Sequence, residues 1–158
     1  MNIIQYPNPI LREISKEVKL PLSAEDKKLL DDMYNYLKEN EDAVGLSAIQ
    51  VGVPKRMCAI RIKDYGGSVF CLKLVNPRIV GHSNDQTFMP EGCLSVPEEH
   101  DELIPRWSSI KLIGYNAITG KNIAINFNGS TYISRVLQHE LDHMDGKLYI
   151  DYIKEVEE

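Results

Sequence analysis

Long apolar runs are missing from this 158-residue sequence, and no segment has the length and apolarity that a helix needs to cross a bilayer. Cysteine is scarce, and the three cysteines cannot all pair with one another, so we expect reduced thiols rather than a disulfide framework. A basic surplus is also missing, since the formal net charge is −5, which argues against nucleic acid as the main partner. The N-terminus lacks a basic stretch followed by an apolar run, so we expect no signal peptide and a cytoplasmic protein.

What is present is the composition of an ordinary globular domain. Hydrophobic residues make up 43% of the chain and charged residues 26%, so a sizeable core can form. We find no internal repeat, low-complexity tract or linker. The length therefore predicts one domain over residues 1–158.

Two helices are predicted, one in each half of the chain. The first begins after Ser23, which with Asp26 three residues later resembles a capping box, and it fades near residue 40. Its apolar residues recur at helical spacing: Leu29, Leu30, Met33 and Leu37. The second helix is predicted over residues 131–145, with Gly146 as its C-cap.

Apolar stretches bounded by turn signals predict strands between these helices. The ranges are 57–63, 69–75, 75–80, 110–115 and 123–127, with a hairpin around Thr119-Gly120 and a flexible tip at Gly66-Gly67. A block of strands flanked by helices predicts an α+β fold. We expect mainly antiparallel sheets packed around a buried C-terminal helix, with the N-terminal helix beside them.

The second helix contains the sequence His139-Glu140-Leu141-Asp142-His143. Two histidines four residues apart lie on one helix face and can bind one metal ion. Glu140 beside them can act as a general base on water that the metal activates. The alternative is a pair of hydrogen-bonded core histidines without a metal.

The other residues of this helix predict which of its sides are buried. Tyr132 and Val136 share the histidine face, and a second apolar stripe runs beside it: Ile133, Leu137, Leu141 and Met144. Because burying bare polar groups is costly, a metal would supply the partner that the histidines need. The remaining face carries polar and charged residues: Ser134, Arg135, Gln138, Asp142 and Asp145. Of these we expect Arg135 and Asp142 to be solvated or ion-paired rather than catalytic, with Arg106 as a candidate partner of Asp142.

A catalytic site of this kind needs a third protein ligand and one open position. A metzincin would place a histidine where this chain has Tyr149, and the sequence ends at Glu158, so we expect the third ligand upstream. Cys93 is the best candidate because Gly92 before it allows close backbone approach, although a free cysteine is more often a small buried hydrophobe. Four other potential ligands are expected in structural or surface positions: Cys58 and Cys71 in apolar strands, and His82 and His100 in polar loops.

Three separated motifs resemble those of one family, the peptide deformylases. They are Gly45-Leu46-Ser47-Ala48-Ile49-Gln50, Glu91-Gly92-Cys93-Leu94-Ser95 and Gln138-His139-Glu140-Leu141-Asp142-His143. The resemblance covers most of the chain and implies removal of the formyl group from the N-terminal formyl-methionine of newly made polypeptides. It also implies one metal ion, usually Fe²⁺ with Zn²⁺ or Ni²⁺ as substitutes, held by three ligands: Cys93, His139 and His143.

The same resemblance implies roles for five further residues. Glu140 would be the acid and base. Gln50 and the backbone N–H of Leu94 would stabilise the oxyanion, for which a side-chain amide and one backbone donor suffice. Gly45, with Val44 beside it, would contact the substrate.

Two positions depart from the family pattern, and both concern substrate contact. Ala43 stands where the family commonly has glycine, and the His100 region stands where many members carry an arginine. Some members are thought to dock on ribosomes through a C-terminal helix. The sequence ends at Glu158, so we expect that helix to be absent and ribosome contact to be transient at most.

Two other functions stay open at this point. One is a metal endopeptidase that cuts within chains, against which stand Tyr149 and the small size. The other is a catalytically weak protein that binds a metal or a formyl-peptide. Ala43 favours it, whereas the presence of both Glu140 and Gln50 speaks against it.

Overall fold

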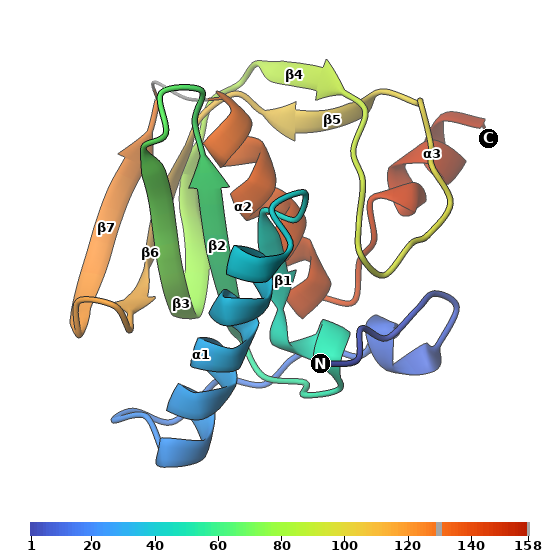
Figure 1. Cartoon of the computed structure of the whole chain (residues 1–158). Helices are drawn as coiled ribbons and strands as arrows, with labels where there is room; N and C mark the ends of the chain where they lie inside the picture. The colour runs from blue at the N-terminus through green and yellow to red at the C-terminus, as the bar shows by residue number, and fades with distance from the viewer. Residues whose placement is uncertain (129–130, 158) are drawn as a thin grey trace.

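The computed structural model describes residues 1–128 and 131–157, which fold into two antiparallel sheets and three α-helices joined by loops (Figure 1). The larger sheet has the strand order β1-β2-β3-β6-β7: β1 (Gly45–Ser47), β2 (Met57–Lys63), β3 (Val69–His82), β6 (Ile110–Asn116) and β7 (Lys121–Phe127). The smaller sheet pairs β4 (Gln86–Met89) with β5 (Ile104–Trp107). The helices are α1 (Ala24–Glu39), α2 (Thr131–Met144) and α3 (Ile150–Glu157), with short 3₁₀ turns η1 (Pro9–Arg12) and η2 (Ala48–Val51).

This arrangement confirms the α+β class with mainly antiparallel sheets. None of the described helices is long and apolar enough to cross a membrane. The N-terminal helix α1 begins as predicted, because the Ser23 hydroxyl oxygen accepts a hydrogen bond from the Asp26 N–H at 3.1 Å. Three of its apolar side chains are fully buried: Leu30, Met33 and Leu37.

The two strands predicted over 69–75 and 75–80 are one strand, β3, with a break in register. Its pairing with β6 shifts between Val75 and Arg78, where Asn76 takes a positive φ of 51°. The Asn76 side chain accepts a hydrogen bond from the Val18 N–H and donates one to the Val18 carbonyl. This bulge bends a strand that the sequence pattern divides in two.

The sequence analysis missed β1, the β4–β5 sheet and α3. β1 is short and wholly buried, and β4 is mostly exposed, so neither shows the alternation that marks a half-buried strand. In α3 the side chains of Ile150 and Ile153 are buried in a cluster with Leu148 and Tyr149. That apolar face is thus occupied inside the protein.

The helix α2 contacts β1 and β2 on one side and β5 on another, so it is buried on more sides than predicted. Leu137, Leu141 and Met144 enter the main core, as expected. Three residues of the polar face are buried: Ser134, Arg135 and Gln138. The reason is β5, since Gln138 bonds both the N–H and the carbonyl of Trp107. Arg135 is ion-paired with Glu91, which is one of the two options predicted for it. Tyr132, predicted to face inward, is 43% exposed.

Gly146 ends α2 as predicted, and its conformation generates a stability test. Gly146 and Gly67 have left-handed backbones with φ of 73° and 87°, so alanine at either costs about 1–2 kcal/mol of strain. Only at Gly146 would the added Cβ also lie 2.5 Å from the Arg12 carbonyl oxygen, whereas at Gly67 nothing lies within 4 Å. Gly146→Ala should therefore lower the free energy of unfolding by at least roughly 1 kcal/mol more than Gly67→Ala, measured by urea denaturation. Equal losses in both variants would contradict this account.

Candidate functional site

The structure brings together the thiol and the two imidazoles predicted as ligands. Cys93 Sγ lies 3.4 Å from His143 Nε2, and His143 Nε2 lies 3.3 Å from His139 Nε2. The three ligand atoms all lie within 4.8 Å of one another. A tetrahedral zinc-type shell with ordinary bond lengths places two imidazole nitrogens about 3.3 Å apart and a nitrogen and sulfur about 3.6 Å apart. The two printed separations are close to these values, so the donor set is suited to one metal ion.

Glu91 orients the first of these imidazoles. Its Oε1 lies 2.8 Å from His139 Nδ1, so the opposite ring nitrogen faces the cluster. This carboxylate–histidine arrangement fixes the ring and its tautomer in metal sites. Glu91 is itself bound by both nitrogens of one Arg106 edge at 2.8 Å and by Arg135 at 2.7 Å.

The charges of this buried network balance. Arg106 also donates to Asp142 at 2.6 Å, which confirms the pair suggested from the sequence. Two carboxylates thus meet two guanidiniums, and the side chains of Glu91, Arg106 and Arg135 are at most 6% exposed. Burial raises the pKa of the Glu91 carboxyl, but the hydrogen bonds from Arg106 and His139 outweigh it and hold that pKa well below its usual value. Burial lowers the pKa of His143, which keeps the ring neutral, as a metal ligand must be.

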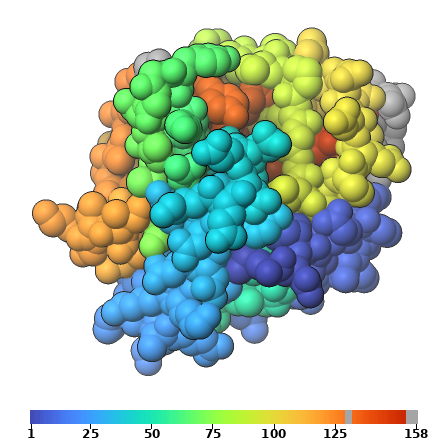
Figure 2. All heavy atoms as spheres, in the orientation of Figure 1, coloured from blue at the N-terminus to red at the C-terminus, as the bar shows by residue number. Residues whose placement is uncertain are grey.

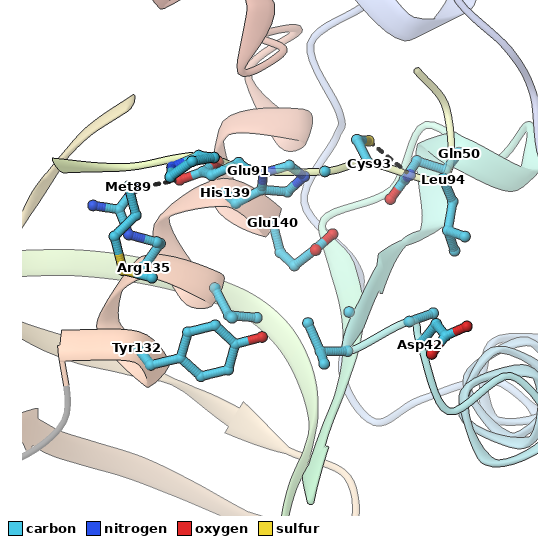
Figure 3. Close-up of a pocket in the computed structure, with 16 residues that line it drawn as sticks. Asp42, Gln50, Met89, Glu91, Cys93, Leu94, Tyr132, Arg135, His139 and Glu140 are labelled. Carbon is cyan, nitrogen blue, oxygen red and sulfur yellow. Dashed lines mark hydrogen bonds and ion pairs between the residues drawn. The ribbon is translucent and has the colours of Figure 1, made fainter. Parts of the chain in front are cut away.

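Glu140 points from α2 into the cavity beside the cluster (Figure 3). Burial raises its pKa, which moves the carboxyl towards the range in which it can accept and return a proton. The Ser47 hydroxyl lies 3.2 Å from its Oε1. A Cβ on Gly45 would lie 2.5 Å from its Oε2, so glycine in β1 makes room for the carboxylate.

Gln50 and Leu94 lie beside Cys93 (Figure 3). Gln50 Nε2 is 3.6 Å from Cys93 Sγ, the contact drawn as a dashed line in Figure 3, and 3.1 Å from Ser95 Oγ. The backbone N–H of Leu94 makes no recorded hydrogen bond within the described residues, whereas its carbonyl accepts one from Gln5. Two donors are thus available beside the metal position.

A cavity of about 360 Å³ opens next to these groups. In Figure 2 the α2 atoms lie at the bottom of a hollow between the segment that leads into β1 and the segment after β4. Its walls carry both the polar groups of the site and apolar side chains: Val44, Met89, Pro90, Leu94, Tyr132 and Val136. The cavity can therefore take an apolar side chain while a polar group reaches the cluster.

The other candidate ligands lie outside the cluster. Cys58 is fully buried in β2, as expected, and Cys71 is only partly buried. His82 is exposed and stacks on the Trp107 ring at 3.8 Å between centroids. His100, predicted on the surface, is half-buried and meets the Tyr149 ring edge-on.

Ala43 is the first departure from the family pattern, and its backbone is not in the strained left-handed conformation. Among the described residues Asn76 is the single non-glycine with positive φ. Ala43 is 8% exposed and packs in a core cluster with Leu46 and Ala48. A methyl group is thus accommodated there, with ordinary backbone geometry.

Sequence reasoning missed the residues that support the site. Glu91, Ser47 and Ser95 belong to the motifs, but no role was predicted for them, and Ser47 and Ser95 are fully buried and each bonds a site residue. The signal for Glu91 was its place two residues before Cys93 in a chain with arginines at 106 and 135. Its burial depends on the tertiary fold, so the pattern alone could not reveal it.

The whole chain, residues 1–158, matches the family described as polypeptide deformylase. A peptide deformylase of Shouchella clausii is 36% identical over 170 aligned residues, which cover 99% of this chain and 91% of that protein. A probable peptide deformylase from Synechococcus phage S-SSM7 superposes with a TM-score of 0.83 at 32% identity, covering 96% of this chain and 99% of that one. The Met-Ala-Ser-bound class I type b peptide deformylase from Acinetobacter baumannii superposes with a TM-score of 0.84 at 26% identity, covering 96% and 97%.

Glu91→Gln should weaken metal binding and stability together. The amide keeps the shape of the side chain but removes the charge that Arg106, Arg135 and His139 share. Loss of such an outer partner typically lowers metal affinity by about 10- to 100-fold, and an uncompensated buried charge costs on the order of 3–5 kcal/mol. Chelator competition and urea unfolding measure the two effects. The exposed Glu99, changed to Gln, is the matched control, and equal behaviour of both variants would refute the role of Glu91.

Proposed function

The chain belongs to the polypeptide deformylase family, and we propose that Cys93, His139 and His143 hold the single metal ion with which it removes the formyl group from formyl-methionyl peptides. The observation that carries this assignment is the convergence of the three ligand atoms within 4.8 Å. When bound, the ion acidifies a water molecule and polarises the formyl carbonyl. Residues 1–158 would act as one catalytic domain.

Fe²⁺ is the native metal in this proposal, with Zn²⁺ or Ni²⁺ as substitutes. Cys93 supplies a thiolate, a soft ligand that reduces the positive charge of the site and suits Fe²⁺. The same thiolate is open to oxidation. We place the reaction in the cytoplasm, where nascent chains and reduced thiols occur together, with no more than transient contact to the ribosome.

Glu140 is the acid and base of the proposed reaction. Its carboxylate lies beside the ligand cluster in a buried site, and it adjoins a ligand without being one. It takes a proton as the formyl carbon is attacked and returns it to the amine that leaves. The raised pKa favours that return.

Gln50 and Leu94 stabilise the oxyanion that forms on the formyl group. The Gln50 amide nitrogen lies 3.6 Å from Cys93 Sγ, which is a long contact. The oxyanion of the substrate can replace this sulfur as the acceptor. The Leu94 N–H is the second donor. Donors held in place before the reaction cost no reorganisation during it.

Gly45 and Val44 bind the substrate chain. β1 is an edge strand of its sheet, and the Val44 carbonyl accepts a hydrogen bond from the Arg61 N–H in β2. Because backbone groups alternate sides along a strand, those of Gly45 face the open edge. A peptide can therefore add to β1 as a further strand, which is the β-augmentation mode of recognition.

The apolar cavity receives the methionine side chain. Val44, Val136 and the partly exposed Tyr132 line it. The Acinetobacter relative with Met-Ala-Ser bound supports this choice, since that tripeptide is what deformylation of formyl-Met-Ala-Ser releases. The expected products are therefore formate and Met-Ala-Ser.

Cys93→Ala should lose the metal, because two imidazoles alone leave the shell open on the side of the thiolate. We expect about one metal ion per chain in the wild type and far less in the variant, measured by elemental analysis after anaerobic purification. Cys71→Ala removes a thiol of the same kind outside the cluster and should keep the metal. Full occupancy in Cys93→Ala would remove Cys93 from the ligand set.

Glu140→Gln should keep the metal and lose turnover of formyl-Met-Ala-Ser. The amide cannot take the proton, and a general acid–base group contributes at least about 10²-fold to the rate. Formate release is the measurement, with metal content determined on the same sample. Near-normal turnover would rule out this role, and cleavage of internal peptide bonds by the wild type would favour the endopeptidase alternative.

A further inference from the structure

Ser47 has no place in the roles proposed above, although it contacts two of the residues that carry them. It is the last residue of β1 and is 0% exposed. Its hydroxyl oxygen lies 2.9 Å from the Glu140 carbonyl oxygen and 3.2 Å from Glu140 Oε1. Its backbone N–H donates to Gln50 Oε1 at 2.9 Å. The base and the oxyanion donor therefore meet at one residue of the edge strand.

We infer that Ser47 is a positioning residue for the hydrolysis of formyl-methionyl peptides, because its hydroxyl sets the rotation of the Glu140 carboxylate while its N–H sets the rotation of the Gln50 amide. This inference rests on the proposed function and deepens it. Among the described residues, the side chain of Ser47 forms its hydrogen bonds away from the metal ligands, and Ser47 does not line the substrate cavity. It acts through its two partners.

The hydroxyl controls which carboxylate oxygen is left for the reaction. Within the described residues, Ser47 is the one side chain recorded as donating to the Glu140 carboxylate. A buried carboxylate needs a donor, and a hydroxyl supplies a single hydrogen that can turn to Oε1. With Oε1 held by Ser47, Oε2 lies against the side-chain-free face of Gly45. When the hydroxyl hydrogen turns from the Glu140 carbonyl oxygen to Oε1, it holds the carboxylate in this rotation and leaves Oε2 to take the proton.

The backbone N–H controls which end of the Gln50 amide faces the metal. An N–H group can only donate, so the amide oxygen of Gln50 must face Ser47 and the amide nitrogen must face Cys93 and Ser95. A flipped amide would turn a carbonyl oxygen towards the negative charge that forms on the substrate. The Ser47 N–H is available because residues 45 and 47 both turn their backbone groups away from β2.

Ser47→Ala separates the two contacts, since it removes the hydroxyl and leaves the N–H in place. The hydroxyl bonds a carboxylate, so kcat for formyl-Met-Ala-Ser should fall by roughly 10- to 100-fold. KM, the affinity for the product Met-Ala-Ser and the metal content should stay within about twofold of the wild type. Ser134→Ala is the matched control, because Ser134 is also 0% exposed and its hydroxyl donates to a carbonyl, that of Trp107, at 3.0 Å. Its kcat should stay within about twofold.

Double variants show whether Ser47 acts through Glu140. In a Glu140→Asp background the shorter carboxylate no longer reaches Ser47, so Ser47→Ala should cost less than about threefold in kcat. In a Gln50→Leu background the full loss should persist, since the hydroxyl meets the backbone N–H of Gln50, which the variant keeps, and not its side-chain amide. The inference fails if Ser47→Ala keeps wild-type kcat, or if its loss is undiminished in Glu140→Asp. An inactive wild type loaded with metal would instead overturn the proposed function.

Discussion

A single buried carboxylate, Glu91, ties the two halves of the site together. It lies on the segment between β4 and β5, two residues before Cys93, and it bonds Arg135 and His139 of α2 and Arg106 of β5. A buried charge is stable only when it is paired and hydrogen-bonded, and Glu91 uses both oxygens for that purpose. The ion network of Glu91 thus connects the segment that carries Cys93 to the helix that carries the two histidines, in addition to the apolar packing of Cys93.

The helix α2 consequently has two buried sides with opposite chemistry. One side enters the apolar core through Leu137, Leu141 and Met144. The other meets β5 through guanidinium, carboxylate and amide groups, such as the amide of Gln138, which bonds the Trp107 backbone. His139 lines the cavity, and the buried His143 lies one turn further along the helix with its Nε2 towards that of His139. A helix held on both sides keeps its ligands in a fixed geometry, as a preorganised metal site requires.

The local pattern of the sequence was enough to predict the long elements. Ser23 precedes the start of α1 and Gly146 follows the end of α2, as expected. The helical spacing of His139 and His143 brings their imidazoles next to one another. The pattern failed where burial is decided by a distant strand. Arg135 and Gln138 are polar and lie on one helix face, so they look solvated until β5 covers them. Short strands such as β1 were also not predicted, because its three residues are all buried and show no alternation of apolar and polar side chains.

The neighbours of His139 show how environment divides two carboxylates between structure and chemistry. Glu91 and Glu140 are both buried, so burial alone would raise the pKa of each. Glu91 bonds two guanidiniums and an imidazole, and these contacts keep it ionised throughout. Glu140 has the neutral Ser47 hydroxyl as its recorded side-chain donor among the described residues, so its pKa stays raised. Two carboxyls whose surroundings push their pKa values apart can take different tasks, and Glu140, where burial outweighs the opposing effects of its neighbours, is the one that can exchange a proton.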